Sequence, residues 1–423
     1  MTESAAAMNR TRWVRLCAAV GAMMLTSIYQ YSWFLFSFEI QKNWGWSLAS
    51  LGLIYTIFHY TSTLVMPFSG MIADTYGPRL VALGASLLVG AGFILCALFP
   101  HLWAFQLFYG LGGIGCGVLY GVSIATAIKW FADRRGLASG LVALGFGGGT
   151  AVFNLFIVRM LETLGLSTTL LYLGIMMLGL LLPLSFVYKY PPASYSRPPA
   201  RGVAAAGRTG ARDYRPGQML GTPQWYLIYF SFSVTVSLVL LFGAQMKLLA
   251  MEYDLPAAYF SLLIVLFPVA NGVSRVLAGI ISDRFGRSVT MVVFYALLGL
   301  SILALLQFGR YPLVFVSLVI LASLLGGAPF ALYPAAIGDL YGTRYATTNY
   351  GITYTAKAWA GLISGWLCGV LASHFGSFTV PLAIVAAASL LAAVLSLPRF
   401  LKAPSVTGST TAGRAEENQA RMG

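Results

Sequence analysis

Long apolar stretches alternate with short polar segments along almost the whole chain. Twelve apolar stretches can be placed, with the following residue limits: 16–38, 47–72, 80–99, 104–128, 137–158, 167–188, 223–246, 258–281, 290–308, 312–333, 349–372 and 378–397. About 20 predominantly apolar residues are enough for a helix to cross the hydrocarbon core of a bilayer. The pattern therefore predicts an all-α membrane protein with twelve transmembrane helices, numbered spans 1 to 12 in chain order.

A polar interval separates the first six spans from the last six. Between Tyr190 and Gly221 the chain holds five arginines and two Pro-Pro pairs. Such a composition cannot bury itself and is typical of a flexible linker. We therefore expect an N-terminal six-helix bundle over residues 1–189, a cytoplasmic linker over 190–221, a C-terminal six-helix bundle over 222–400 and a disordered cytoplasmic tail over 401–423.

Composition excludes a soluble protein of several domains. Hydrophobic residues make up 58% of the 423 residues, charged residues only 9%, and the mean hydropathy is +0.80, whereas soluble proteins carry about 25% charged residues. The four cysteines form no CxxC pair, so neither a zinc site nor a disulfide framework is expected. The chain is expected to bind no metal and no cofactor.

The net charge of +14 could indicate a nucleic-acid partner, but the positions of the charges favour another explanation. If both termini lie in the cytoplasm, 20 of the 26 Lys and Arg residues fall in cytoplasmic segments, four in outer loops and two within spans. This bias follows the positive-inside rule for membrane proteins. We therefore expect a multi-pass protein of the cell (inner) membrane with both termini in the cytoplasm, in contact with the lipid bilayer and not with nucleic acid.

A short motif recurs after half the chain. It follows span 2 and again span 8, and its residues are Gly70, Asp74, Gly77 and Arg79, then Gly279, Asp283, Gly286 and Arg287. The two aspartates are 209 residues apart. Duplicated helical bundles are a transporter architecture, in which the substrate lies near the midplane between the halves. We expect the motif to act in conformational change; the alternative is that Gly, Asp and Arg only mark tight cytoplasmic turns.

Two basic residues, Arg275 in span 8 and Lys357 in span 11, lie within the predicted membrane interior. Each is some eight residues from a cytoplasmic helix end, which corresponds to a depth of about 12 Å. All twelve acidic residues are placed in loops or tails, so no carboxylate within a span is expected to pair with them. A cation at this depth costs at least about 2.5 to 3.5 kcal/mol and is a functional residue by default, unless it snorkels to the interface.

The two cations predict a small organic anion as the ligand that completes the site. Arg presents a planar fork of donors that matches a carboxylate, and Lys adds a point charge. Asn271 lies one helical turn from Arg275 and could orient the guanidinium or bond the substrate; bonding between helices is the alternative. Tyr354 precedes Lys357 by one turn and is expected in the cavity wall. His59 in span 2 is a candidate proton site, or else a buried, hydrogen-bonded histidine.

Several stretches resemble a known group of transporters. The Gly-x-x-x-Asp-x-x-Gly pattern, its recurrence and the twelve-span plan resemble the major facilitator superfamily. Four further stretches resemble the oxalate/formate antiporter family, which is related to the monocarboxylate transporters: QYSW at 30–33, RRGLASG at 134–140, TPQ at 222–224 and NYG at 349–351. The resemblance runs from about Arg12 to Arg399 and implies a secondary active transporter of small carboxylates that works by alternating access.

The resemblance also implies roles for single residues. Arg275 and Lys357 match the positions at which oxalate/formate antiporters hold their substrate, and Tyr31 and Tyr120 match positions that face it. Monocarboxylate transporters carry an aspartate where this chain has Asn271. The obvious proton carrier is therefore missing, which favours exchange of one anion for another.

Three positions depart from the oxalate transporter pattern. Phe146 in span 5 and Phe330 in span 10 stand in place of tyrosines, and Gly326 stands in place of a tryptophan. A cage with less bulk and fewer hydroxyls suits a larger or more apolar acid, so a monocarboxylate such as lactate or pyruvate becomes a candidate beside oxalate and formate.

Two other functions remain as alternatives. A proton-coupled monocarboxylate symporter would need His59, another group or the substrate itself to carry the proton. A membrane-embedded enzyme would need a nucleophile, a metal cluster or an acid pair within the spans, and no combination of His, Cys, Asp and Glu supplies one. We therefore expect a transporter and not an enzyme, working as a monomer.

Overall fold

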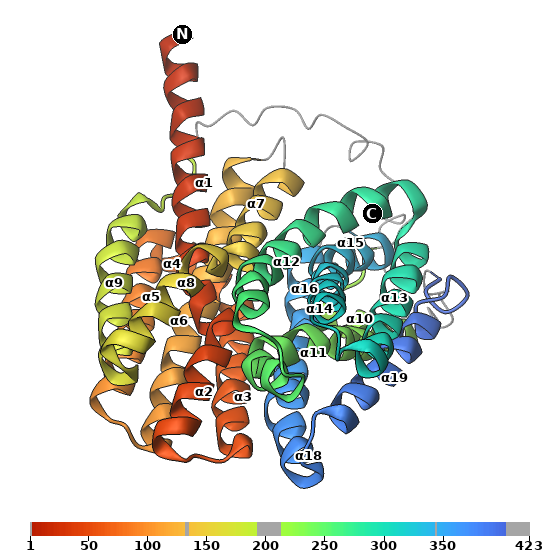
Figure 1. Cartoon of the computed structure of the whole chain (residues 1–423). Coiled ribbons are helices and arrows are strands. Elements are labelled where there is room, and N and C mark those ends of the chain that lie inside the picture. Colours follow the sequence, from red (N-terminus) through yellow and green to blue (C-terminus); the bar gives the residue numbers. More distant parts are fainter. Residues whose placement is uncertain (1, 132–134, 193–212, 343–344, 403–423) are drawn as a thin grey trace.

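The computed structural model describes residues 2–131, 135–192, 213–342 and 345–402. Every regular element in this part of the chain is a helix, and the helices form two groups that lie side by side (Figure 1). The first group contains α1 (Thr2–Tyr31), α2 (Trp33–Trp44), α3 (Leu48–Leu64), α4 (Met66–Tyr76), α5 (Pro78–Leu98), α6 (Leu102–Trp130), α7 (Arg135–Gly148), α8 (Thr150–Leu164) and α9 (Leu166–Val187). The second group contains α10 (Pro216–Leu220), α11 (Pro223–Glu252), α12 (Ala257–Phe285), α13 (Arg287–Phe308), α14 (Pro312–Gly326), α15 (Pro329–Tyr341), α16 (Ala346–Tyr354), α17 (Ala356–Gly361), the π-helix η2 (Leu362–Leu367), α18 (Cys368–Phe375) and α19 (Thr379–Leu395).

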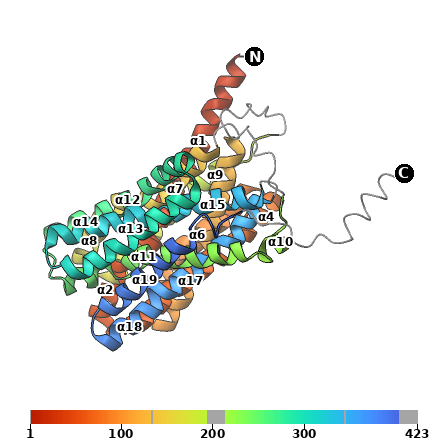
Figure 2. The ribbon, with the colours of Figure 1, turned by 90° about the vertical axis from the view of Figure 1, so that its right-hand side faces the viewer.

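The helices reproduce the twelve predicted spans. Ten helical segments of the described chain are long and apolar enough to cross a membrane, and α19 is a shorter apolar helix of 17 residues. The remaining span is formed by α1 and α2 together, with a break at Ser32. Figure 2 shows the long helices of the second group running roughly parallel to one another. The predicted all-α membrane fold is confirmed.

Several spans are broken near their middle. Span 1 breaks at Ser32 and span 5 at Gly149, both of which are buried, and span 11 breaks at Thr355 before it continues into η2. Irregular backbone is tolerated at membrane depth only inside protein or along a cavity, and π-helical turns are frequent at functional sites. The breaks therefore direct attention to the region between the two groups.

A proline explains one contact between the groups. Pro268 lies inside α12 and has no N–H to donate to the carbonyl of Ile264, four residues earlier. The side-chain amide of Asn154, from α8, donates to this carbonyl at 3.0 Å, and its oxygen accepts from the Ser32 hydroxyl at 2.6 Å. Asn154 is only 1% exposed. One buried amide thus joins α8, the break in span 1 and α12.

Helix α3 packs closely against α17 and η2 of the second group. A Cβ atom on Gly52 would lie 2.2 Å from the carbonyl oxygen of Gly365, so the backbones touch at this point. The Thr56 hydroxyl donates to the carbonyl of Gly361 at 3.1 Å. By the predicted topology these contacts lie in the outer half of the spans, so the two groups are closed against each other on that side.

The recurring motif forms the same turn twice. Gly77 between α4 and α5 and Gly286 between α12 and α13 adopt φ values of 82° and 91°, a region that suits glycine because it has no Cβ. After the second turn, Arg287 pairs with Asp283 at 2.5 Å and with Asp339 at 3.3 Å. Each motif therefore reverses the chain between consecutive helices, and its role in conformational change stays a prediction.

Some predictions concern residues outside the described part: linker residues 193–212, tail residues 403–423 and the side chain of Asp74. The end of the predicted linker is ordered. The amide of Tyr214 donates to the Tyr341 carbonyl at 2.9 Å, and the Asn349 amide donates to the Tyr214 carbonyl at 3.0 Å. Residues 213–221 therefore pack with the second group, whereas the limits of the two bundles stay predictions.

Candidate functional site

Arg275 lies between the two groups of helices and is only 4% exposed. Its guanidinium donates to the carbonyl of Ala143 in α7 at 2.9 Å and to Asn271 Oδ1 at 3.2 Å. The same group lies 3.5 Å from the hydroxyl of Tyr31, which itself donates to Asn271 Oδ1 at 3.1 Å. A cation of the second group is thus bonded to α1 and α7 of the first, and Asn271 orients it.

This network leaves buried donors without an acceptor. Within the described residues, the Nε–H of Arg275 and the side-chain nitrogen of Asn271 have no hydrogen-bond partner. None of the salt bridges found in that part of the chain includes Arg275 or Lys357. Because unpaired buried donors are costly, the arrangement is suited to receive the oxygen atoms of a ligand.

Lys357 follows the break at Thr355 and is only 3% exposed. Its Nζ lies 5.4 Å from the ring centroid of Phe146 and 5.7 Å from that of Tyr354. Aromatic faces attract cations at such distances. A snorkelling side chain would reach the interface, whereas this one is buried beside two rings. Its role in binding a substrate stays a prediction.

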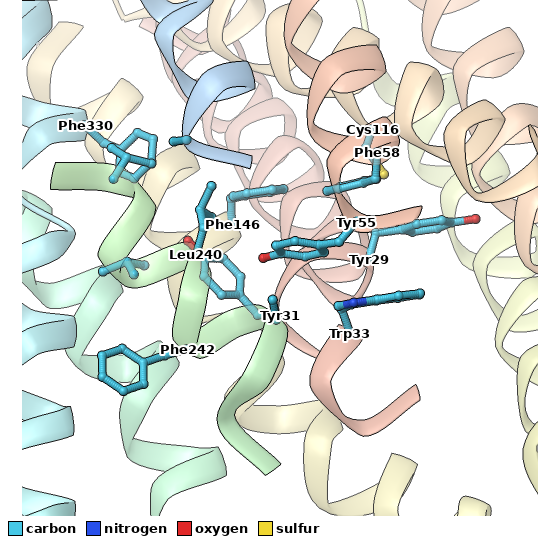
Figure 3. Close-up of a cluster of buried hydrophobic side chains, with 14 of the residues drawn as sticks. Tyr29, Tyr31, Trp33, Tyr55, Phe58, Cys116, Phe146, Leu240, Phe242 and Phe330 are labelled. Carbon is cyan, nitrogen blue, oxygen red and sulfur yellow. The ribbon is translucent and has the colours of Figure 1, made fainter. Parts of the chain in front are cut away.

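The other predicted wall residues gather between the two cations. Tyr120 stacks on Tyr354 with ring centroids 6.0 Å apart and meets Phe146 edge-on at 5.4 Å. Tyr31 meets Phe146 at 5.9 Å. Phe330 lies 6.2 Å from Tyr354 and under the Arg275 guanidinium, 4.5 Å from it. Figure 3 shows Tyr31, Phe146 and Phe330 within this buried aromatic cluster.

A small cavity lies beside Lys357. Its lining consists of Phe58, Ser62, Met66, Cys116, Gly117, Tyr120, Phe146, Tyr354 and Lys357. The cavity volume is about 10 Å³, which is about what one water molecule needs. This is too little for an organic anion, so the cavity is closed in this structure and would have to widen to admit one.

Part of the cavity lining carries no signal in the sequence. Phe58, Ser62 and Met66 of span 2 and Cys116 and Gly117 of span 4 are small or apolar residues of a kind that fills every span. A Cβ atom on Gly117 would lie 2.0 Å from the Ser62 carbonyl oxygen. Only the packing of α3 and α4 against α6 brings these residues to the cavity.

His59 is fully buried on α3 and packs against the second group. Its Nδ1 lies 2.9 Å from the carbonyl of Tyr55, while its Nε2 has no partner among the described residues. A Cβ atom on Gly361, one turn after Lys357, would lie 2.3 Å from the His59 Cβ. His59 is therefore a buried, hydrogen-bonded histidine close to the site, and a proton-carrying role stays a prediction.

Gly326 stands where the oxalate transporter pattern has a tryptophan, but the smaller residue does not enlarge the cavity. A Cβ atom on Gly326 would lie 2.1 Å from Cγ2 of Val239, because α11 fills this space. The expectation of a less bulky cage is thus wrong at this position. Phe146 and Phe330 remain as the departures that make the walls more apolar.

Comparison with known proteins agrees with this architecture. The profile of the Major Facilitator Superfamily matches residues 16–251 and 226–421. The oxalate:formate antiporter of Oxalobacter formigenes is 30% identical over 369 residues, which cover 86% of each chain. Monocarboxylate transporter 9 of Gallus gallus is 30% identical over 119 residues, 28% of this chain and 24% of its own. The xylose transporter XylE from E. coli, in an inward-open conformation, has a TM-score of 0.72 at 15% identity, covering 96% of this chain and 99% of its own.

The family profile matches twice, once over the first group together with α11 and once from α11 through the rest of the second group. The likeness to XylE shows the same fold over nearly the whole length of both chains. Multiple apolar helices together with transporter relatives make this an integral multi-pass membrane protein. The chain belongs to the Major Facilitator Superfamily, as its motifs and its twelve-span plan predicted.

Proposed function

We propose that this transporter carries small carboxylates and exchanges one for another by alternating access, with Arg275 and Lys357 neutralising the bound anion. The observation that carries the proposal is the pair of buried cations that have no carboxylate partner in the described chain, beside the unused donors of Arg275 and Asn271. The relative named for oxalate and formate supports the same class of substrate and the exchange reaction.

A carboxylate matches the groups that the site offers. The Nε–H of Arg275 and the amide of Asn271 can each donate to one carboxylate oxygen, and Lys357 supplies the second positive charge. Tyr120 and Tyr354 provide hydroxyl donors on rings that line the cavity, whereas the Tyr31 hydroxyl already donates to Asn271 Oδ1. No bond of the substrate is broken in this scheme, so the protein acts as a carrier and not as an enzyme.

Preference for exchange follows from the charges. In the empty site two cations are dehydrated and repel each other, and each buried ion costs several kcal/mol. A bound anion removes much of this cost, so the loaded protein passes between its outward and inward states more readily than the empty one. A substrate carboxylate also competes with the Ala143 carbonyl for the guanidinium that joins the two groups.

The apolar walls favour a monocarboxylate over oxalate. Phe146 and Phe330 cannot donate to a second carboxylate, and they lie beside the two cations. Formate, lactate and pyruvate each carry one carboxylate and leave the remaining wall apolar. The partial match to a monocarboxylate transporter supports this class.

The proposal also includes the setting of the protein. We place it in the cell membrane as a monomer. Both termini lie in the cytoplasm in this proposal, because that orientation puts 20 Lys and Arg residues in cytoplasmic segments and only four in outer loops, as the positive-inside rule requires.

A proton-coupled monocarboxylate symporter is the second candidate. It is favoured by one observation, the buried and unpartnered Nε2 of His59 near Lys357. An imidazole can take up a proton at physiological pH. In that case an imposed pH gradient alone would drive uptake into vesicles that contain no exchangeable anion.

The test is uptake of labelled oxalate, formate and lactate into proteoliposomes, either empty or preloaded with the unlabelled acid, without a pH gradient. We expect uptake only into preloaded vesicles, with formate or lactate entering faster than oxalate. Equal uptake by empty vesicles would contradict exchange, and uptake that needs a pH gradient would establish the symporter.

A further inference from the structure

A second basic site lies on the predicted cytoplasmic side, where the first half of α1 meets the start of α5 and the end of α9. A pocket of about 330 Å³ opens there, lined by Arg10, Thr11, Val14, Arg15, Arg79, Phe186 and Val187. Among the described residues, the lining holds three arginines and no acidic residue. The proposed carboxylate site uses none of these residues. Arg79 belongs to the recurring motif, but the expected role of that motif in conformational change does not account for Arg10, Arg15 and the apolar part of the lining.

The three arginines carry uncompensated charge. No salt bridge in the described part of the chain includes any of them. Arg10 and Arg79 are exposed, whereas Arg15 is half-buried, contacts the Val187 carbonyl and lies over the Trp130 ring. Burial and the neighbouring charge of Arg79 lower the pKa of Arg15. An anion in the pocket would offset this repulsion.

The end of a helix adds to the positive potential. Helix α5 begins at Pro78, directly after the turn at Gly77, so Arg79 lies in its first turn. The N-terminus of a helix carries a partial positive charge and is favourable for phosphate groups. The arginines and the helix end therefore act in the same direction.

The pocket also has an apolar side. Val14 is 50% exposed and Phe186 is 58% exposed. Arg15 directly precedes span 1 and Val187 lies at the end of span 6, so the pocket lies at the predicted boundary between the bilayer and the cytoplasm. A soluble anion would use only the charged side, whereas a phospholipid presents a phosphate and acyl chains together.

We propose that this pocket binds the phosphate of an anionic phospholipid of the cytoplasmic leaflet, with its acyl chains along Val14 and Phe186. Guanidinium forks match phosphate oxygens, and basic pockets between transmembrane helices on the cytoplasmic side are suited to anionic headgroups. The bound lipid contacts the first half of α1, the first turn of α5 and the end of α9.

The test uses the purified full-length protein in a neutral detergent, titrated with dioctanoyl phosphatidylglycerol and, separately, dioctanoyl phosphatidylcholine. Native mass spectrometry counts the bound lipids. We expect one saturable phosphatidylglycerol and no comparable phosphatidylcholine. The double variant Arg10→Gln, Arg79→Gln should bind about 25-fold more weakly, since each arginine contributes about five-fold. The control double variant Arg284→Gln, Arg310→Gln removes the same charge from exposed sites of the second group and should bind normally.

Equal binding of the two lipids, or equal weakening in the control variant, would overturn the proposal. Inorganic phosphate is added as a third ligand. If it displaces phosphatidylglycerol with similar affinity, the pocket is a site for soluble anions and the lipid assignment is wrong. If the double variant proves unstable, Arg10→Gln alone, at an exposed side chain, should still weaken binding about five-fold, and an unchanged affinity would refute the proposal.

Discussion

Arg275 is bonded to three oxygen atoms of the protein itself, two of which belong to the other helix group. Its planar fork can hold these partners and still present Nε–H to a substrate, which an ammonium group cannot do. We expect Arg275→Gln to lower the exchange rate at least about 100-fold, and Arg275→Lys to restore only part of it. Anion exchange in proteoliposomes with equal amounts of protein measures both.

The matched control is Arg284→Gln, which removes the same charge from an exposed position on the same helix α12. It should exchange anions at the wild-type rate. If Arg275→Gln transported with unchanged affinity and rate, the guanidinium would not be part of the substrate site.

Asn271 provides a second test at the same place. Its Oδ1 accepts from both Tyr31 and Arg275, so Asn271→Asp would put a fixed carboxylate 3.2 Å from the guanidinium with little change in shape. This internal anion should compete with the substrate and raise KM about ten-fold or more. The isosteric change keeps packing, so a KM equal to that of the wild type would show that the substrate does not bind Arg275.

Sequence alone could identify the two cations, because charged side chains are rare in apolar spans. It could not identify the acceptor that Arg275 uses in the first group, since that acceptor is the backbone carbonyl of Ala143. A backbone oxygen has the same chemistry at every position, and only the fold decides which one is within reach. Sequence alone also could not show that Val239, from another helix, fills the space beside Gly326, so the expectation of a wider cage there was wrong.

At the level of helices, α3 and η2 touch through their backbones in what the predicted topology makes the outer half of the molecule. Gly52→Ala adds a Cβ atom that would lie 2.2 Å from a backbone oxygen, so the two helices must separate. Alanine otherwise favours a helix by about 1 kcal/mol over glycine, so a defect would come from the contact. We expect at least about a ten-fold loss of exchange in a folded protein.

Gly84→Ala, on helix α5 of the first group and outside the recurring motif, is the control for this variant, because a Cβ atom there meets nothing within 4 Å. It should transport normally and be at least as stable as the wild type. Normal exchange by Gly52→Ala would mean that close approach of α3 and η2 is not needed for transport.

The contact of Asn154 with α12 depends on the proline that frees the Ile264 carbonyl. Asn154→Ala should destabilise the protein by about 1 to 3 kcal/mol, because it leaves two buried polar groups unpaired. In a Pro268→Ala background the helix can satisfy that carbonyl itself, so the same change should cost less. A double-mutant cycle on thermal unfolding measures the coupling, and strictly additive effects would refute this explanation.

Hydropathy predicted every span, because each helix that crosses a bilayer must be apolar over a fixed length. The breaks at Ser32 and Thr355 were not predictable, since neither position carries a proline or glycine. At both breaks a side chain of another helix bonds the hydroxyl: Asn154 accepts from Ser32, and Tyr229 lies 2.9 Å from the Thr355 hydroxyl. Local sequence therefore predicts where helices lie, and the packing between groups decides where they bend.

Over the whole molecule, the buried charge that would bind the substrate opposes the stability of the empty protein. Lys357 is enclosed by rings with no salt-bridge partner in the described chain, and dehydrated ions of this kind cost several kcal/mol. A protein that keeps such a group does so at the expense of stability, a trade that is common at functional sites.

Lys357→Met should therefore abolish exchange and raise the unfolding temperature of the substrate-free protein. The uncharged side chain of similar length should raise the free energy of unfolding by about 1 to 3 kcal/mol. Substrate at 100 times its Kd should raise the free energy of unfolding of the wild type by about 2.7 kcal/mol and that of the variant by almost nothing. Thermal unfolding in detergent with and without the anion measures both effects. Lys42→Met, at an exposed position of α2, changes the net charge equally and should show neither effect. A variant less stable than the wild type, or one that keeps the substrate-induced shift, would show that Lys357 is a structural cation, because removal of a buried ion without a partner should stabilise the substrate-free protein.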